Sequence, residues 1–365
     1  MSDFPAPCET TAAHVATLFG VQAQSVRWMS GGFSEASVFR VLASDGRQFA
    51  VRSVLAASAM SDDQWEFFVR LLRRMRDNRN DVIVVPIAAP IVGAVLSDNV
   101  RAFTADDRAV GTTRIRLHQH FWQTERWLPG EASSEPPSPL QLDSTLHCLR
   151  MFHEAAVKAA TILPPNEWYY VGRGKSPGIL RRLEIAGQLI DGTLPRYRQL
   201  TANDANGEFR QLAMRICNVL ETWLPWLLQR LKPLASESFL LQPVMRDLWR
   251  AHVLFTGHSV TGLIDLSAMS TDHVGYDLTR LFRSWYRSDS EKICGAVRGY
   301  MANRSLSELD LLLFQALDAS TVLLSPVTWL RRRIASQNEL KLTPERIARI
   351  QEVTELAEHF QPLGL

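Results

Sequence analysis

The sequence predicts an α+β protein of two lobes, with an antiparallel β-sheet in the N-terminal lobe and mostly helices in the C-terminal lobe. Three observations predict this arrangement. Short β-branched runs separated by turn residues fill residues 1–127, Pro, Ser and Gly interrupt this pattern over 128–138, and helical periodicities dominate 139–365. A chain of 365 residues is long enough to bury two cores. We therefore expect a smaller β-rich lobe, a linker and a larger helical lobe at these boundaries.

The N-terminal lobe is expected to begin with a short helix and to continue as strands and one longer helix. The first helix is predicted around Thr10 to Phe19, and three strands between Ser25 and Val54. The pair Asp45-Gly46 lies between apolar runs and indicates a hairpin, because it supplies the positive φ angles of a tight turn. A capped helix follows from Ser61 to Arg76. From Val82 to Trp127, alternating runs predict more strands of the same sheet.

The C-terminal lobe has helical spacing of its apolar residues, with one interruption. The helical patterns run from Leu142 to Ala156, Phe209 to Leu231 and Leu306 to Arg333, and a last helix begins at Thr343 and Pro344. Strand-like runs return between Phe239 and Ala268, where Thr256-Gly257 predicts a turn between two strands. Loops around such an embedded hairpin are common positions for reactive groups.

The composition is that of a globular protein, 46% hydrophobic and 21% charged. A net charge of +2 gives no strong field to attract nucleic acid or an anionic membrane. The N-terminus lacks a basic region followed by an apolar core, and no stretch approaches about 18 uninterrupted apolar residues. We therefore expect a cytoplasmic protein with no nucleic-acid or membrane partner. The 4 cysteines lack a CxxC pair, so neither a zinc site nor a disulfide framework is indicated and buried thiols are expected.

Two aspartates bracket the embedded strands. Asp247 lies in MRDLWRAHVLF and Asp265 in TGLIDLSAM, each next to an apolar strand, where an ionised carboxylate is costly without a metal or a hydrogen-bonding partner. If the two strands pair as a hairpin, both carboxylates reach the same end of it. One carboxylate is then placed to accept a proton while the other holds a cation. A turn or capping role is the alternative for each aspartate taken alone.

The segments DLWRAHVLF and GLIDL resemble the catalytic segment of the aminoglycoside phosphotransferase and choline kinase families, relatives of the protein kinases. In those families His-Gly-Asp is followed after four residues by Asn and later by Ile-Asp. The resemblance implies a two-lobed protein-kinase-like fold, with Asp247 as the catalytic base for the acceptor hydroxyl and Asp265 as the metal-binding carboxylate. His252 occupies the Asn position and is the second candidate metal ligand.

Other segments resemble the same families in the expected order, over roughly residues 25 to 285. The turn where the families place a glycine-containing loop over the phosphates consists of Ser30, Gly31, Gly32, Phe33 and Ser34. Arg52 has the position of the basic residue that contacts the α and β phosphates, and Glu66 that of its acidic partner. The linker TERWLPGE and the helix LHCLRMFHEA also match, as does the segment GYDL, which in these families supports the catalytic loop from a helix start. The alternatives are a surface role for Arg52 and a solvated acid at Glu66.

The resemblance implies an ATP-dependent phosphotransferase that moves the γ-phosphoryl group to an alcohol group of a small molecule, with Mg²⁺ or Mn²⁺ as cofactor. Met245 and Arg246 replace the usual His-Gly, and His252 replaces Asn, although imidazole is a poorer ligand than oxygen for Mg²⁺. We expect Arg246, beside Asp247, to help neutralise the transferred phosphate. The same departures favour the alternative of a weak or inactive kinase-like protein that binds a nucleotide or metabolite. ATP or GTP use and the oligomeric state are left open.

Two further residues have structural roles in this prediction. His153 lies on an apolar helical stripe and is expected to be a hydrogen-bonded core histidine, and Asp277 is expected at a helix start, where it favours the helix dipole.

The acceptor is not determined by the sequence. A polycationic antibiotic requires clustered acidic residues in its binding site, whereas the acidic residues of the last helices are interspersed with arginine. These acidic residues are Glu308, Asp310, Glu352, Glu355 and Glu358. Sugars, amino alcohols and homoserine-like hydroxyls are equally compatible acceptors.

Overall fold

A computed structural model describes residues 7–29, 36–77, 81–87, 100–103, 113–302, 307–336 and 341–365. The chain divides into two compact units. The N-terminal unit comprises Met1–Glu131, Glu154–Tyr169 and Leu254–Ile264, and the C-terminal unit comprises Ala132–His153, Tyr170–Val253 and Asp265–Leu365. The embedded hairpin thus belongs with the N-terminal unit, while the aspartates on both sides of it belong with the C-terminal unit.

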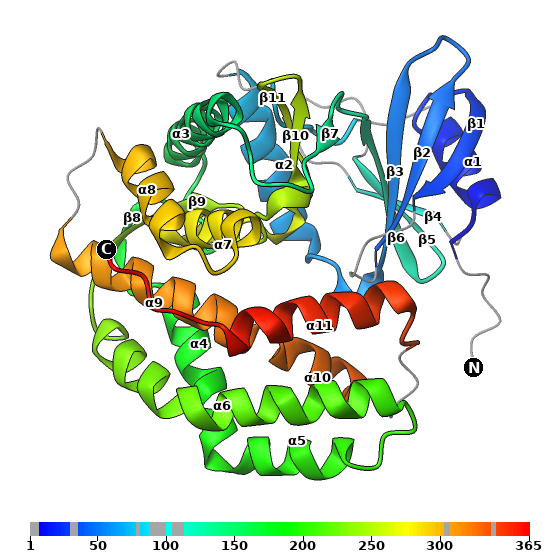
Figure 1. Ribbon diagram of the computed structural model, residues 1–365. Helices are drawn as coiled ribbons and strands as arrows, with labels where there is room; N and C mark the ends of the chain where they lie inside the picture. The colour runs from blue at the N-terminus through cyan, green and yellow to red at the C-terminus, as the bar shows by residue number, and fades with distance from the viewer. Residues whose placement is uncertain are drawn as a thin grey trace. The chain divides into compact units, whose positions relative to one another are not determined.

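The N-terminal unit contains a six-stranded antiparallel sheet in the order β1-β2-β3-β6-β5-β4 (Figure 1). Its strands are β1 (Ala23–Met29), β2 (Ser37–Ala43), β3 (Gln48–Leu55), β4 (Val100–Phe103), β5 (Arg114–Leu117) and β6 (His120–Arg126). Gly46 has φ +82° in the turn between β2 and β3. The hairpin predicted from Asp45-Gly46 is therefore confirmed.

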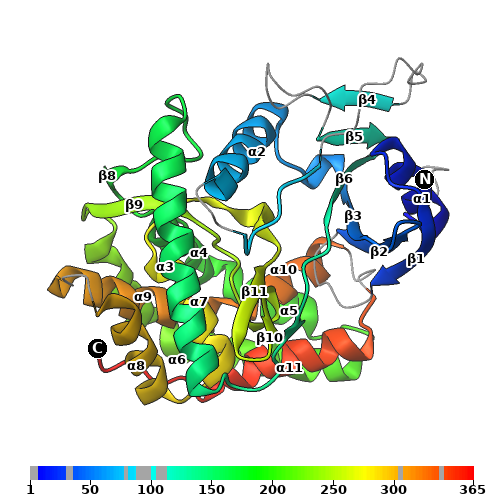
Figure 2. The ribbon, with the colours of Figure 1, turned by 90° about the horizontal axis from the view of Figure 1, so that it is seen from above.

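One face of this sheet forms a core with helix α1 (Glu9–Leu18), which lies beside β1 and β2 in Figure 2. Phe39, Val51 and Trp122 from three neighbouring strands are buried there, together with Val15 of α1. Because side chains alternate along a strand, Arg52 of β3 lies on the opposite face. Helix α2 (Asp62–Asp77) buries the predicted apolar stripe.

The hairpin consists of β10 (Val253–Thr256) and β11 (Ser259–Leu263), and β10 also pairs with β7 (Glu131–Ala132). The linker packs against this hairpin at Gly130, which has φ +100°. A Cβ atom there would lie 2.4 Å from Thr261 Oγ1 and 2.7 Å from the Phe255 carbonyl oxygen. Thr261 Oγ1 also donates a hydrogen bond to the Pro129 carbonyl at 2.7 Å. Only glycine fits this linker position without displacing the hairpin.

The C-terminal unit is mostly helical. Its helices are α4 (Pro177–Gln188), α5 (Leu194–Thr201), α6 (Gly207–Leu234), α7 (Gly275–Tyr286), α8 (Ser290–Met301), α9 (Glu308–Leu324), α10 (Val327–Ala335) and α11 (Pro344–Glu358), and α3 (Pro139–Ile162) crosses the division between the units. A small sheet pairs β12 (Ser270–Asp272), β9 (Phe239–Val244) and β8 (Gly172–Gly174) in that order.

Two sequence expectations are corrected by the structure. The pattern from Leu306 to Arg333 is not one helix, because α9 ends at Leu324 and α10 begins after Pro326, with a bend of 42° between them. Cys8 is exposed, whereas the other three cysteines are buried. Among the described residues no single helix is both long and apolar enough to cross a membrane, and only the bent pair α9 and α10 meets that length and composition test.

Candidate active site

The loop that follows β9 is held by a buried carboxylate from α7. Asp277 is fully buried, and its two oxygens accept hydrogen bonds from the backbone N–H groups of Met245 (2.8 Å to Oδ2) and Arg246 (2.7 Å to Oδ1). Arg246 has φ +62°, a left-handed conformation that favours glycine. The two hydrogen bonds fix this strained turn and set the direction of the next residue, Asp247.

His153 supports the same carboxylate from α3. It is fully buried, with Nε2 at 3.1 Å from Asp277 Oδ2 and Nδ1 at 2.7 Å from the Tyr300 hydroxyl. With the carboxylate as acceptor, Nε2 carries the proton and Nδ1 accepts from Tyr300. The prediction of a hydrogen-bonded core histidine is confirmed, and Asp277 holds the loop from the start of α7, the role that the resemblance implies for its segment.

Asp247 leaves the loop toward solvent and has a cationic neighbour on α7. Its side chain is 42% exposed, and Arg280 donates a hydrogen bond from Nη2 to Asp247 Oδ1. The second oxygen, Oδ2, makes no hydrogen bond to another described group. An accessible carboxylate with one oxygen fixed and one oxygen open is suited to accept a proton from a bound hydroxyl.

His252 joins the two aspartates. Its Nδ1 donates to the Asp247 carbonyl oxygen at 2.7 Å, its Nε2 accepts from the Trp249 indole N–H at 2.8 Å, and Nε2 lies 3.7 Å from Asp265 Oδ2. Burial lowers the pKa of His252, although both aspartates act to raise it, so the imidazole is held neutral. Both ring nitrogens are occupied in this arrangement. His252 therefore positions the loop, and the predicted role of metal ligand does not match its geometry.

Asp265 follows β11 in a left-handed conformation, with φ +60°. Its Oδ1 accepts a hydrogen bond from Ser267 at 3.0 Å, and its side chain is 27% exposed. Among the residues that the structure describes, no group of three or more acidic, histidine or cysteine side chains forms a preassembled metal cage. Mg²⁺ is commonly held by one or two carboxylates together with substrate phosphates, and the accessible oxygens of Asp265 fit that mode.

Arg246 projects beside a second buried carboxylate. Its Nε lies 4.0 Å from Asp272 Oδ2, and its guanidinium lies over the Tyr276 ring at 5.2 Å. Asp272 is fully buried and accepts hydrogen bonds from Ser176 Oγ (2.6 Å) and the Gly178 N–H (2.8 Å). Arg246 is thus close in sequence to Asp247 but its side chain is directed at Asp272 and Tyr276.

The predicted N-terminal residues are only partly within the described structure. Ser30, Gly31, Gly32, Phe33 and Ser34 lie outside it. Arg52 forms an ion pair with Glu125 of the neighbouring strand at 3.7 Å, while Glu66 pairs with Arg70 on its own helix. The contacts of Arg52 and Glu66 thus differ from the mutual pair that the family resemblance implies.

A groove of about 750 Å³ lies within the N-terminal unit, on the sheet face that carries Arg52. Its lining comes from β2, β3, the linker and β10, and comprises Arg40, Gln48, Trp127, Pro129, Gly130, Glu131, Phe255 and Thr256. Pockets of roughly 300–1,000 Å³ are typical of small-molecule and cofactor sites. The groove is large enough for a nucleotide.

Sequence reasoning missed several residues around the catalytic loop. Arg280 of α7 and Asp272 of β12 contact it from elements that follow the hairpin, and Trp249, although it lies within DLWRAHVLF, was not assigned a role. The sequence signal for Arg280 was its place in a helix that follows Asp265 and contains further arginines.

A β-sheet unit and a helical unit, with one acidic residue before and one after a hairpin, are the parts of the kinase-like phosphotransferase fold. The family model described as "phosphotransferase enzyme family" matches residues 26–303. The chain belongs to this family, whose members act on small molecules.

Solved structures share the fold at low sequence identity. An amicoumacin kinase in complex with AMP-PNP and Ca²⁺ has a TM-score of 0.60 and 13% identity, with 98% of this chain and 95% of that chain covered. An aminoglycoside phosphotransferase from Alicyclobacillus acidocaldarius has a TM-score of 0.58 and 14% identity, with 98% of this chain and 94% of that chain covered. A spectinomycin phosphotransferase in complex with ADP has a TM-score of 0.53 and 12% identity, with 97% of this chain and 100% of that chain covered. No curated protein matches the chain in sequence.

Proposed function

We propose that this protein transfers the γ-phosphoryl group of ATP to a hydroxyl of a small molecule. The observation that carries the proposal is the meeting of the Asp247 and Asp265 segments at His252, on a loop that Asp277 holds in place. Related folds have been solved with AMP-PNP and with ADP, which supports nucleotide use. Use of ATP also agrees with the cytoplasmic location expected from the sequence.

In this proposal each residue has a separate task. Asp247 accepts the proton of the acceptor hydroxyl as the oxygen attacks the γ-phosphorus and the bond to ADP breaks. Asp265 would hold Mg²⁺ or Mn²⁺, which would supply positive charge to the phosphate oxygens. The linker groove takes the nucleoside, and Arg52 with the loop from Ser30 to Ser34 contacts the phosphates.

The alternative is a weak or inactive relative that binds a nucleotide or metabolite. It is favoured by one observation, that His252 uses both ring nitrogens within the loop and leaves Asp265 without the second ligand expected at the Asn position. Binding without turnover is the outcome that this alternative predicts.

The test is nucleotide binding followed by turnover. AMP-PNP with Mg²⁺ or Mn²⁺ is expected to raise the thermal unfolding midpoint, and ATP is expected to be consumed with an alcohol panel. Asp247→Asn should lower turnover by about 10²- to 10⁴-fold while AMP-PNP still binds, because only the base is lost. The exposed Asp191→Asn is the matched control. Turnover by Asp247→Asn equal to that of the control would refute the assignment of the base.

A further inference from the structure

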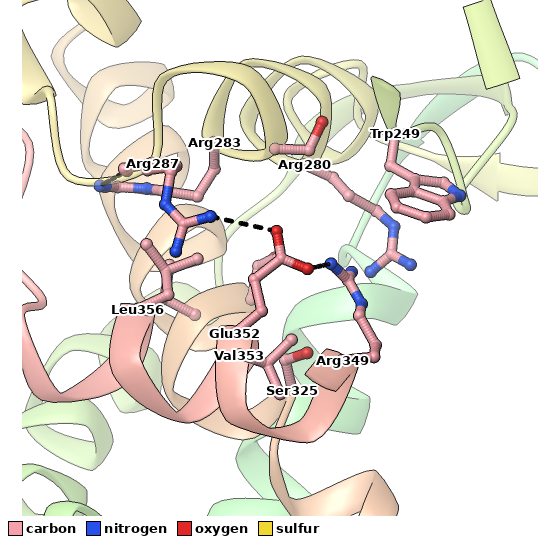
Figure 3. A pocket seen from close by; sticks show the side chains of 12 residues that line it. Trp249, Arg280, Arg283, Arg287, Ser325, Arg349, Glu352, Val353 and Leu356 are labelled. Atoms are coloured by element: carbon pink, nitrogen blue, oxygen red, sulfur yellow. Dashed lines mark hydrogen bonds and ion pairs between the residues drawn. The ribbon is translucent and has the colours of Figure 1, made fainter. Parts of the chain in front are cut away.

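A small, arginine-rich pocket lies next to the catalytic loop within the C-terminal unit (Figure 3). It has a volume of about 50 Å³. Its lining comes from the loop and from α7, α9 and α11, and comprises Trp249, Arg280, Arg283, Ser284, Arg287, Thr321, Val322, Ser325, Arg349, Glu352, Val353 and Leu356. Trp249 follows Asp247 by two residues, so the pocket is adjacent to the candidate base.

A single carboxylate in the lining is shared by three guanidinium groups. Glu352 accepts from Arg250 (3.0 Å) and Arg287 (3.2 Å) at Oε1, and from Arg349 (2.5 Å) at Oε2. Burial acts to raise the pKa of Glu352, but these arginines outweigh it and hold the pKa below its usual range. Glu352 is therefore ionised, and it neutralises only one of the three positive charges.

Arg280 adds a fourth cation. Its guanidinium is directed toward Arg349 and Trp249 in Figure 3, and its Nε is buried without a hydrogen-bond partner. Burial lowers the pKa of Arg349, and Arg280 and Arg250 lower it further despite Glu352. Arg283 does not add to this excess, because it is paired with the buried Asp318. With Glu352 and Asp247 counted, four guanidinium groups face two carboxylates.

A second group of arginines lies around Tyr276 of α7. Burial acts to raise the pKa of the Tyr276 hydroxyl, but Arg182, Arg246 and Arg280 together lower it. The guanidinium groups of Arg182 and Arg246 lie over the Tyr276 ring at 4.1 and 5.2 Å. Arginine charge of α7 and its neighbours thus acts at Tyr276 as well as in the pocket, with the buried Asp272 as the acid that opposes it there.

The acids that a cationic acceptor needs are engaged elsewhere. Glu358 makes a bidentate ion pair with Arg215, and Asp310 completes the cap of α9 with Ser307. Glu355 accepts from Gln351 at 2.8 Å. Among the described residues, Glu352 is the one acid in the pocket lining, and it is surrounded by arginine.

We propose that the acceptor is a hydroxyl compound that also carries an oxyanion, a phosphate ester or a carboxylate, and that the oxyanion binds Arg280, Arg287 and Arg349. This inference rests on the proposed phosphotransferase function and identifies its acceptor class. A water needs about 10–15 Å³ of such space, so 50 Å³ admits about four water-sized groups, the size of one oxyanion and not of an antibiotic. Arginine forks match phosphate and carboxylate oxygens.

In the reaction, the anchored acceptor presents its hydroxyl to Asp247. The hydroxyl oxygen forms a bond to the γ-phosphorus, the bond from that phosphorus to the ADP oxygen breaks, and the hydroxyl proton passes to Asp247. The arginines near the pocket take no proton. Their task is to fix the acceptor so that attack is effectively intramolecular.

The anion site is tested first without turnover. Inorganic phosphate should raise the thermal unfolding midpoint of the wild type, both alone and with saturating AMP-PNP, and should do so much less in Arg349→Gln. The control is Arg346→Gln on the same helix, where the arginine bonds to the Lys341 carbonyl. If Arg349→Gln does not fold, the half-exposed Arg287→Gln takes its place. The proposal is overturned if phosphate does not stabilise the wild type, or if it stabilises the test and control variants equally. It is also overturned if saturating AMP-PNP abolishes the stabilisation by phosphate.

The acceptor class is then tested with matched pairs, such as glycerol against glycerol 3-phosphate and against glycerate. The anionic member should have a kcat/KM about 10- to 100-fold higher, and Arg349→Gln should remove most of that preference mainly through KM. The phosphate and carboxylate arms identify which oxyanion is used. Preference for the neutral member overturns this inference while the phosphotransferase function stands. Absence of any AMP-PNP binding is instead the failure of the proposed function itself.

Discussion

Replacing Asp277 with asparagine alters only one atom of the carboxylate that holds the catalytic loop. In the native protein this buried side chain accepts three hydrogen bonds, from the backbone of Met245 and Arg246 and from the His153 ring. An asparagine has one acceptor oxygen, and its NH₂ group can only donate. In either orientation of the amide, its NH₂ group faces at least one of the N–H groups that donate to Asp277 in the native protein. That N–H group then has no acceptor.

The expected cost follows from these contacts. An unsatisfied buried donor costs about 1–3 kcal/mol, and the remaining bonds lose the strength that the charged acceptor gives them. We therefore expect Asp277→Asn to lower the free energy of unfolding by about 2–4 kcal/mol, a large part of the roughly 5–15 kcal/mol of a typical domain. The strained Arg246 turn should also relax, which moves Asp247 and lowers kcat.

Urea denaturation followed by circular dichroism measures this change. The matched control is Asp191→Asn, which makes the same chemical change at an exposed position. We expect the urea midpoint to fall in Asp277→Asn and to stay within error in the control. An unchanged midpoint and unchanged kcat in Asp277→Asn would refute the reasoning that this carboxylate holds the loop.

Two further predictions concern the linker and pH. Gly130→Ala should destabilise the protein by more than about 1 kcal/mol in thermal or urea unfolding, because the added Cβ meets Thr261 Oγ1 and the residue has positive φ. The control is Gly257→Ala, in a turn where an added Cβ meets no atom within 4 Å. Equal unfolding midpoints of the two variants would contradict this prediction. The pKa of His252 is lowered by burial, so below about pH 6.5 the unfolded chain binds the proton more tightly and stability falls as pH decreases. His252→Gln should reduce that fall between about pH 7 and 5, and an unchanged pH profile of the urea midpoint would exclude His252 as its source.

The order of elements was predictable because local rules determine it. The Asp45-Gly46 turn, the Ser61 cap and the Thr343-Pro344 start gave the hairpin, α2 and α11 in their observed places. The long pattern in the last third predicts one helix, because periodicity alone does not reveal that the helix ends before Ser325 and Pro326.

The candidate site was predictable only where a motif is local. Asp247 and Asp265 were found because each adjoins a strand of one hairpin, and the hairpin turn brings their segments to the same end. The role of His252 was not predictable, since it depends on the Trp249 indole taking one ring nitrogen and the Asp247 carbonyl taking the other. No rule of residue spacing in the sequence predicts either of these two hydrogen bonds.

By itself, the sequence determined the class of fold, several of its hairpins and helices and the two candidate acidic positions, because turns, caps and apolar periodicity act over a few neighbouring residues. Only the tertiary structure decided which charges meet. Arg280 and Arg349 are 69 positions apart in numbering, yet they share one pocket with Glu352, because α7 and α11 pack on the same loop. The charge of that pocket is a sum over side chains from separate helices, and no local pattern in the chain contains it.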